Sequence, residues 1–262
     1  MAHEQDDVAA VKVGDHGAIV LTAQSEEDAF AELAASLKST GIPPGEILGN
    51  LALFVPSKHL ARWLFFRDIY TLVVNTHGLI VEFGVRWGQT LALLSNLRSI
   101  YEPFNRHRRI VGFDTFEGFR GVAREDGVRT PCRDGDFSVT PSYEEELSRL
   151  LALHERINPM SHLRRFELVK GDAVETVPAW FDAHPEAVVS LAIFDFDIYT
   201  PTKAALLAVK PRLFKGSVLV FDELSDDVFP GETVAVQEVL GLNTLRIQRS
   251  PSVSRVCYAV IE

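Results

Sequence analysis

Short apolar runs alternate with segments of helical periodicity along the chain from Gly78 onward. The apolar and β-branched runs predict strands at Leu79–Phe83, Arg109–Phe113, Phe166–Val169, Val188–Phe194 and Ser217–Phe221. Segments with apolar residues three and four positions apart predict helices at Gln89–Ile100, Ser142–Asn158, Ala173–His184 and Pro201–Leu213. Because strands that alternate with helices pair in parallel, the pattern predicts a parallel sheet with helices on both faces.

The end of the chain adds two antiparallel strands to this sheet. The runs Thr244–Gln248 and Val253–Ile261 are joined by a tight Arg-Ser-Pro-Ser turn, and so short a connection permits only an antiparallel pair. The expected fold is therefore α/β, with a doubly wound, seven-stranded, mostly parallel sheet. This Rossmann-like arrangement is that of class I methyltransferases.

An N-terminal helical cap is expected ahead of the sheet. Residues 1–77 are predicted to form a helical region packed on a catalytic domain of residues 78–262. Within the cap, Ser57 is expected to begin a helix over Lys58–Val74 that roofs the substrate side of the sheet. Its apolar positions at helical spacing are Leu60, Trp63, Leu64, Ile69, Leu72 and Val73.

The segment from Gly118 to Pro141 has no periodicity and carries many glycines, prolines and charges. A loop of this length inside a compact domain is usually functional or disordered. Since it follows a strand end, we expect a mobile lid over the active site, with a merely solvated loop as the alternative.

Composition and charge exclude several classes of protein. The chain has 262 residues, 47% of them hydrophobic and 24% charged, which is typical of a globular protein. Its two cysteines, Cys132 and Cys257, are too few and too far apart for a zinc site or a disulfide framework. The net charge of −10 disfavours a nucleic-acid partner. The polar N-terminus and short apolar runs predict a cytoplasmic protein without a membrane span.

The segment from Glu82 to Gly88 leaves a predicted strand and enters a predicted helix. In open α/β sheets, ligands bind at the carboxyl ends of the strands. Gly84 permits a tight turn against a ligand, and Gly88 permits a close approach at the helix start. A dinucleotide site needs a further glycine where Arg86 stands. The acidic Glu82 instead suits the ammonium group of S-adenosylmethionine, although an ordinary strand-to-helix turn is the alternative.

Two more acids follow strand ends. Asp114 ends the second strand, where a carboxylate can accept hydrogen bonds from both ribose hydroxyls of a nucleoside, and an NAD site would use it too. Asp172 and Ala173 follow the third strand, where a carboxylate and a backbone N–H can contact an adenine edge. The alternative role for Asp172 is the N-cap of the next helix.

A group of acids follows the next two strands. Asp195 and Asp197 come directly after Val188–Phe194, and Asp222 and Glu223 come after the following strand. If these strands are neighbours, Asp195 lies beside Asp222 and Glu223. Three converging carboxylates suit a hard divalent cation, here Mg²⁺, or a general base supported by other acids. A helix cap plus solvated acids is the alternative.

In this order the four segments resemble the TylF/MycF-type family of sugar O-methyltransferases from macrolide and aminocoumarin antibiotic pathways. That family's motifs look like E-x-G-V-x-x-G, D-[ST]-F-x-G, D-x-D-x-Y and D-D. Here they stand as Glu82–Gly88, Asp114–Gly118, Asp195–Tyr199 and Asp222-Glu223. Enzymes that methylate a nucleotide-activated deoxysugar, as in calicheamicin biosynthesis, are a nearer analogue.

The resemblance implies methyl transfer from S-adenosylmethionine to a sugar hydroxyl in secondary metabolism. It assigns cofactor binding to Glu82, Gly84, Gly88, Asp114, Thr115, Phe116, Asp172, Ala173 and Asp195. It assigns a magnesium ion to Asp195, Asp222 and Glu223, with Asp195 also the catalytic base. Glu223 in place of the second aspartate, and Phe196 where the family often has glycine, depart from the pattern.

Three alternatives to this function remain at the level of the sequence. One keeps the cofactor and takes a catechol-like acceptor, one is an NAD-dependent oxidoreductase, and one is a non-catalytic relative. The expected partners are a small-molecule sugar acceptor and further copies of the chain in a homo-oligomer. Neither a nucleic acid nor a membrane is expected.

Overall fold

The computed structural model describes residues 12–13, 19–20, 24–127 and 132–262. A seven-stranded sheet in the order β5-β4-β3-β6-β7-β9-β8 forms its centre. The parallel strands are β3 (Leu79–Phe83), β4 (Ile110–Asp114), β5 (Phe166–Lys170), β6 (Val189–Phe194) and β7 (Val218–Phe221). The antiparallel strands are β9 (Cys257–Val260), which pairs with β7, and β8 (Gln248–Arg249). The predicted doubly wound sheet with its C-terminal antiparallel pair is confirmed, although the first strand of that pair is Gln248–Arg249 and not Thr244–Gln248.

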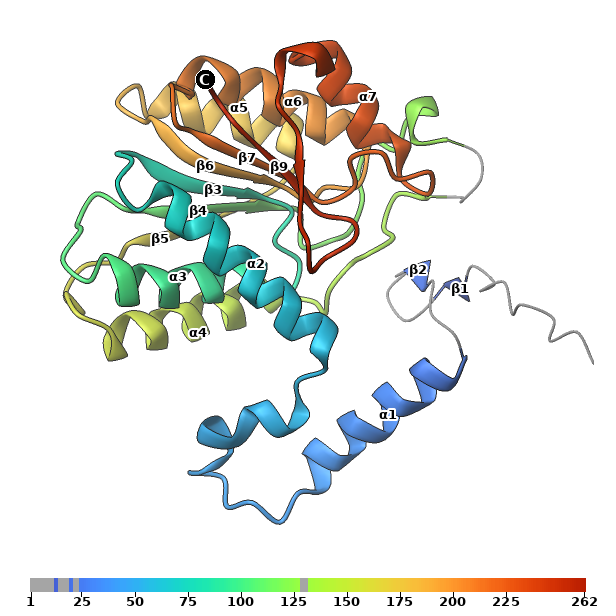
Figure 1. Ribbon diagram of the computed structural model, residues 1–262, viewed down its shortest axis with the longest axis vertical. Helices are drawn as coiled ribbons and strands as arrows, with labels where there is room; N and C mark the ends of the chain where they lie inside the picture. The colour runs from blue at the N-terminus through green and yellow to red at the C-terminus, as the bar shows by residue number, and fades with distance from the viewer. Residues whose placement is uncertain (1–11, 14–18, 21–23, 128–131) are drawn as a thin grey trace, which may run out of the picture.

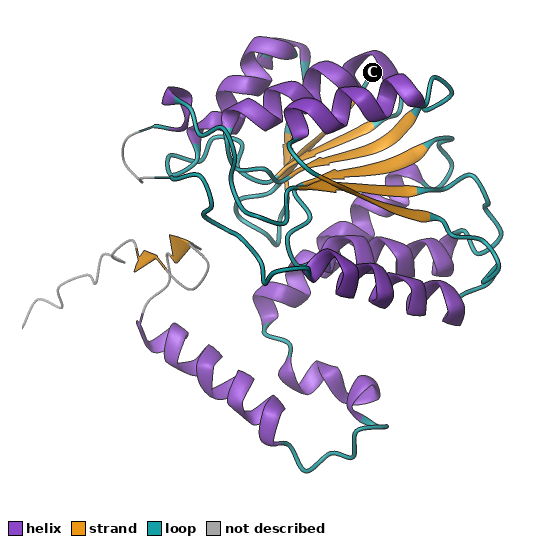
Figure 2. Ribbon diagram, turned by 180° about the vertical axis from the view of Figure 1, so that it is seen from behind, coloured by secondary structure: helices purple, strands orange, loops and turns teal. Residues whose placement is uncertain are grey.

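Helices cover both faces of the sheet (Figures 1 and 2). One layer holds α2 (Ser57–Val73), α3 (Gln89–Tyr101) and α4 (Tyr143–Ile157). The opposite layer holds α5 (Ala173–Ala183), α6 (Tyr199–Val209) and α7 (Pro230–Val239). Short 3-10 turns follow or separate these helices: η3 (Arg124–Asp126), η4 (Lys210–Arg212) and η5 (Leu242–Thr244). Sequence analysis did not predict α7.

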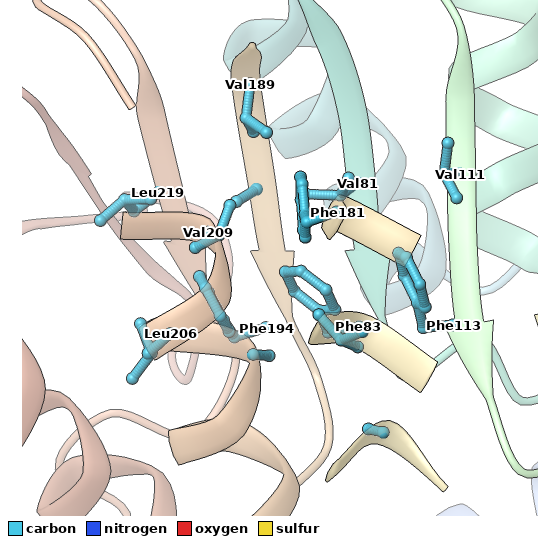
Figure 3. Packing of buried hydrophobic residues seen from close by; sticks show 14 of the residues in the cluster. Val81, Phe83, Val111, Phe113, Phe181, Val189, Phe194, Leu206, Val209 and Leu219 are labelled. Atoms are coloured by element: carbon cyan, nitrogen blue, oxygen red, sulfur yellow. The ribbon is translucent and has the colours of Figure 1, made fainter. Parts of the chain in front are cut away.

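Each strand sends alternate side chains into two separate cores. On β3, Val81 and Phe83 face the α5–α7 layer, whereas Ile80 faces the α2–α4 layer. This period of two is the reason that the central strands read as continuous apolar runs. Figure 3 shows the first core, where the rings of Phe83, Phe113 and Phe194 lie in a row across adjacent strands.

The buried stripe of α2 differs from the predicted one. The buried side chains are Phe65, Phe66, Ile69, Tyr70 and Val73. Leu60, Leu64 and Leu72 are instead 45–46% exposed. Both faces of this helix carry apolar residues at helical spacing, and the aromatic face buries more area. Arg62 lies one turn before Phe66 and therefore shares the buried face. Pro56 rather than Ser57 is the N-cap.

The chain before α2 projects away from the sheet (Figures 1 and 2). This part comprises α1 (Gln24–Ser39) and the 3-10 helix η2 (Ile47–Phe54), preceded by the paired strands β1 (Lys12–Val13) and β2 (Ile19–Val20). Every residue of η2 is at least partly exposed. Thus α2 packs on the sheet, whereas α1 and η2 do not cover it. The division at residues 77 and 78 stays a prediction.

Candidate functional site

The row of phenylalanines fixes the positions of the residues that follow it. Phe83 pairs with Phe113 and Phe194, and Phe194 pairs with Phe221, in the register of the parallel sheet. The neighbouring rings stack or tilt against one another with centroids 5.0–5.4 Å apart. The next residue of each strand is therefore held at the same sheet edge. These residues are Gly84, Asp114, Asp195 and Asp222, and all of them line one cavity of about 400 Å³.

Gly84 is required because two strand ends approach each other closely. Its φ is +97°, and a Cβ built on it would lie 1.9 Å from the carbonyl oxygen of Asp195. An alanine at this position would displace the backbone that carries Asp195. Gly84 was predicted to permit a turn against a ligand. In the structure it also brings the first motif against the acid motif of β6.

Asp114 holds the turn after β3 in place. Its Oδ2 accepts hydrogen bonds from the backbone N–H groups of Val85 and Arg86, both at 2.7 Å, and its Oδ1 accepts one from Phe116 at 2.6 Å. Burial raises the pKa of Asp114, and these backbone donors act in the opposite direction. A carboxylate offers about four lone-pair sites, so Asp114 keeps capacity for a ligand hydroxyl beside its three backbone donors.

Glu82 is a buried carboxyl group with one free acceptor. It is 2% exposed, and its Oε2 atom has no hydrogen-bond partner among the described residues. Burial, followed by the nearby Asp195 carboxylate, raises the pKa of Glu82 well above its ordinary value. A buried acceptor without a partner is costly, and a ligand ammonium group at the cavity wall would satisfy it.

The other predicted cofactor residues fall into two groups. Thr115, Asp172 and Ala173 line the cavity. The Asp172 side chain also accepts a hydrogen bond from the Val174 N–H at 2.9 Å and so is the N-cap of α5. Gly88 and Phe116 lie outside the lining. Gly88 begins α3 at a φ of +75° against the Leu147 side chain, and Phe116 is buried in the core under α3.

An arginine from α2 bridges two of the predicted metal ligands. Arg62 donates a hydrogen bond from Nη1 to Asp222 Oδ1, and another from Nη2 to Asp195 Oδ2 at 2.8 Å. Although burial favours the neutral form, the Asp222 and Asp195 carboxylates raise the pKa of Arg62. Arg62 therefore stays charged and neutralises part of the acid cluster.

The carboxylates that converge on one point are those of Asp195, Asp197 and Glu223. Each offers one oxygen, and these oxygens lie within 4.8 Å of one another. The set differs from the predicted one in one member, since Asp197 stands in place of Asp222, and the Asp222 carboxylate is hydrogen-bonded to Arg62. Burial, together with the Asp222 charge, raises the pKa of Asp195 well above its ordinary value. Burial also raises the pKa of Asp197 to about 7, despite a hydrogen bond with Glu223.

Further ionisable residues contact this cluster from the segment before β9 and from α7. Arg255, just before β9, places its Nη2 2.8 Å from Asp226 and 3.8 Å from Glu223. Glu232 of α7 is fully buried, and its Oε1 accepts a hydrogen bond from the Glu223 backbone N–H at 3.0 Å. The described carboxylates at this edge outnumber the guanidinium groups, so a proton or a cation would relieve the repulsion among them.

The segment predicted as a lid is folded against the cavity over its described residues. Phe119 and Asp136 are joined by a backbone hydrogen bond of 2.8 Å, and the Phe119 and Phe137 rings stack at 4.9 Å in the cavity wall. Asp126 is 2% exposed and accepts hydrogen bonds from the Ala123 and Tyr199 N–H groups. A merely solvated loop is therefore wrong for these parts. Residues 128–131 lie outside the described residues, and mobility stays a prediction.

Sequence reasoning missed several residues of the site. Arg62 and His59 line the cavity from α2, and Arg255 lines it from the segment before β9. The position of Arg62 one turn before Phe66 on the aromatic stripe was a usable indication. No pattern in the sequence pointed to Arg255, because the antiparallel pairing of β9 with β7 brings it to the acids.

The chain was compared with known proteins. No protein-family model and no curated protein sequence matches it. CalS11, a calicheamicin methyltransferase, is 36% identical with a TM-score of 0.90, over 99% of this chain and 98% of that one. The apo structure of CalS11, described as a TDP-rhamnose 3'-O-methyltransferase, has a TM-score of 0.82 at 36% identity, over 92% of this chain and 96% of that one.

A more distant match extends the likeness of the fold. The O-methyltransferase NovP is 18% identical with a TM-score of 0.58, over 77% of this chain and 79% of that one. Each helix in the described ranges is too short or too polar to cross a membrane. The match to CalS11 over nearly the whole of both chains agrees with the four sequence motifs and with the site that they form. The chain therefore belongs to the TylF/MycF-type family of sugar O-methyltransferases, which use S-adenosylmethionine as the methyl donor.

Proposed function

We propose that this enzyme methylates a hydroxyl group of a deoxysugar carried on a nucleoside diphosphate. One observation supports this most strongly. A single cavity is lined by the buried Glu82, by Asp114, by the acids of the Asp195 cluster and by arginines. The relative CalS11, described as acting on TDP-rhamnose, is 36% identical over nearly the whole chain.

The cofactor end of the cavity fits S-adenosylmethionine. The free Oε2 of Glu82 suits the ammonium group of the methionine part. Asp114 has acceptor capacity for a ribose hydroxyl, and Asp172 and Ala173 line the wall where an adenine would lie. These residues bind and orient the donor, which reduces the entropy cost of the transfer.

Asp195 is the residue best suited to accept the proton of the sugar hydroxyl. It lies at the end of β6, directly against Gly84 of the cofactor motif, so the donor and the base are adjacent. A carboxylate at this position can accept the proton that the hydroxyl loses as the methyl group is transferred. Its ionised form is favoured by Arg62, which donates to Oδ2.

The donor set at this edge also fits a magnesium ion. Asp195, Asp197 and Glu223 supply carboxylate oxygens within 4.8 Å of one another, and oxygen is the ligand that Mg²⁺ prefers. Asp222 follows the same strand end as Glu223 and belongs to the ligand set that the resemblance implies. A bound Mg²⁺ would lower the pKa of a coordinated sugar hydroxyl.

Arginines around the cavity suit the diphosphate of a nucleotide-linked sugar. Arg86 and Arg120 line the wall near the stacked Phe119 and Phe137 rings. The Arg86 guanidinium lies 4.8 Å from the Phe137 ring centroid. Guanidinium groups bind phosphate oxygens in a bidentate manner, so they provide local positive charge in a chain whose net charge is −10.

The test is a labelled methyl-transfer assay with several acceptors. Methyl-labelled S-adenosylmethionine and Mg²⁺ are incubated with TDP-linked deoxysugars, a glycosylated macrolide and a catechol. We expect label in the TDP-linked sugars, loss of transfer in Asp195→Asn, and normal transfer in Asp182→Asn, an exposed acid on α5. Label only in the macrolide or the catechol would overturn the nucleotide-sugar assignment.

Several properties stay proposals beside this one. The enzyme is proposed to act in the cytoplasm as a homo-oligomer, without a nucleic-acid partner. Size-exclusion chromatography with light scattering measures the oligomeric state directly. A monomer at the protein concentration of the methyl-transfer assay would contradict the proposed homo-oligomer.

A further inference from the structure

Arg62, on a helix that packs against the sheet, forms ion pairs with two acids at the sheet edge. Its guanidinium group joins two carboxylates that follow adjacent strands, Asp195 after β6 and Asp222 after β7. Its side chain is 21% exposed and lies over the Phe66 ring, with the guanidinium carbon 5.1 Å from the ring centroid. The guanidinium therefore stands at the edge of the cavity, with solvent on one side and the acids on the other.

This contact changes which acids are available to a metal ion. The oxygens that converge belong to Asp195, Asp197 and Glu223. Asp222, the neighbour of Glu223 in sequence, is outside this group and is hydrogen-bonded to Arg62. Asp195 belongs to both sets, because Arg62 uses its Oδ2 atom. A guanidinium ion and a divalent cation would thus share Asp195 and would repel each other across it.

We propose that Arg62 is a built-in cation that competes with the divalent metal. In the metal-free enzyme it neutralises Asp195 and withholds Asp222 from the metal ligands. Metal binding displaces the guanidinium group toward solvent and returns Asp222 to the cluster. This inference rests on the proposed metal site.

The fold favours such an exchange over a permanent ion pair. Arg62 lies in the second turn of α2. This helix is the first element that packs on the sheet, and the chain before it projects away (Figure 1). The buried anchors of α2 begin at Phe65, so Arg62 precedes the part of the helix that the core holds. Movement of the side chain to solvent would give up its contact with the Phe66 ring but would leave the buried side chains from Phe65 to Val73 in place. Metal binding would then also break the ion pairs that join α2 to the sheet edge.

The test measures metal binding in the absence of cofactor and acceptor. Mn²⁺ serves as the probe, because the EPR signal of its free aquo ion decreases on binding. In Arg62→Gln we expect the Mn²⁺ dissociation constant to fall at least tenfold relative to the unaltered chain. Arg62→Lys keeps the positive charge but cannot contact both carboxylates in the same way. Its Mn²⁺ dissociation constant should lie between those of Arg62→Gln and the unaltered chain. The control is Arg67→Gln, an exposed arginine on the same helix that pairs with Asp68, and its affinity should be unchanged.

A double-mutant cycle tests the role of Asp222. If Arg62 withholds this carboxylate, Asp222→Asn should weaken Mn²⁺ binding more in the Arg62→Gln background than in the unaltered chain. Circular dichroism and thermal unfolding show whether each variant folds. Unchanged or weaker Mn²⁺ binding by folded Arg62→Gln would overturn the proposal. If neither the unaltered enzyme nor Arg62→Gln binds Mn²⁺, both the proposed competition and the proposed metal site are overturned. The methyl-transfer assay with and without chelator tests catalysis independently.

Discussion

Single residues at the strand ends combine a structural and a chemical role. Asp114 supports the turn of the first motif through three backbone N–H groups and also faces the cavity. Gly84 permits the approach of Asp195, whose carboxylate then lies beside the cofactor motif. A substitution here therefore changes both the backbone of the binding turn and the groups presented to the ligand. Both the thermal stability and the ligand affinity of such a variant therefore need to be measured.

Replacement of Asp114 by asparagine should weaken cofactor binding at least tenfold. The amide NH₂ group would face at least one of the Val85, Arg86 and Phe116 N–H groups, which then loses its acceptor. The neutral amide also replaces a charged acceptor for the ribose hydroxyl, and a hydrogen bond to a charged group contributes about 1.5–3 kcal/mol, where about 1.4 kcal/mol corresponds to tenfold in affinity. Isothermal titration with S-adenosylmethionine measures the change. Asp182→Asn is the control, and an isotherm that Asp114→Asn leaves unchanged would remove Asp114 from the binding site.

At the scale of elements, sequence patterns predicted the strands better than the sides of the helices. The strands of the central sheet are buried on both faces, so their runs are apolar throughout, and β3 was predicted at its observed bounds. The helix α2 carries apolar residues on two faces, and periodicity alone selected Leu60 and Leu64 instead of Phe65 and Phe66. That choice concealed Arg62. Contacts between elements distant in sequence, such as Asp126 with α6, leave no local pattern.

The segment from Gly118 to Pro141 should open when its anchor on α6 is weakened. Asp126 accepts one N–H from Ala123 at 2.7 Å and one from Tyr199 at 2.6 Å. Asp126→Asn keeps only one acceptor oxygen, so trypsin should cleave at Arg120, Arg124 or Arg133 severalfold faster than in the unaltered chain. Glu125→Gln is the matched control.

Ligands should have the opposite effect on this cleavage. If the segment closes over the site, S-adenosylmethionine and acceptor together should slow cleavage in the unaltered chain. Gel densitometry of the tryptic fragments gives both rates. Equal rates in Asp126→Asn and the unaltered chain, with no response to ligands, would mean that the segment is not a lid.

At the scale of the whole molecule, the fold collects buried acids at one edge of the sheet. The sequence predicted that Asp195, Asp222 and Glu223 would follow neighbouring strands, and the strand order β6-β7 is as expected. The identity of the converging trio could not be predicted, because it depends on how the side chains at the strand ends are oriented and paired, as Asp222 is with Arg62 from α2. Burial of these carboxylates, followed by Coulomb interaction among them, raises the pKa of Asp195 and of Glu223. The folded enzyme therefore gains stability from any cation that binds there.

Mg²⁺ should raise the thermal stability of the enzyme as well as its activity. A ligand that binds only the folded state stabilises it by about 2.7 kcal/mol at a hundred times its dissociation constant, which corresponds to a shift of several degrees in Tm for a chain of this size. Scanning calorimetry of chelated enzyme, with and without Mg²⁺ at constant ionic strength, measures this shift. Asp195→Asn should abolish both the shift and turnover, yet leave the affinity for S-adenosylmethionine nearly unchanged, because its role is on the acceptor side. A different result would assign another role to Asp195. If the chelated enzyme keeps full activity, Mg²⁺ does not shift its Tm, and Asp195→Asn is inactive, then Asp195 is a base that works without a metal.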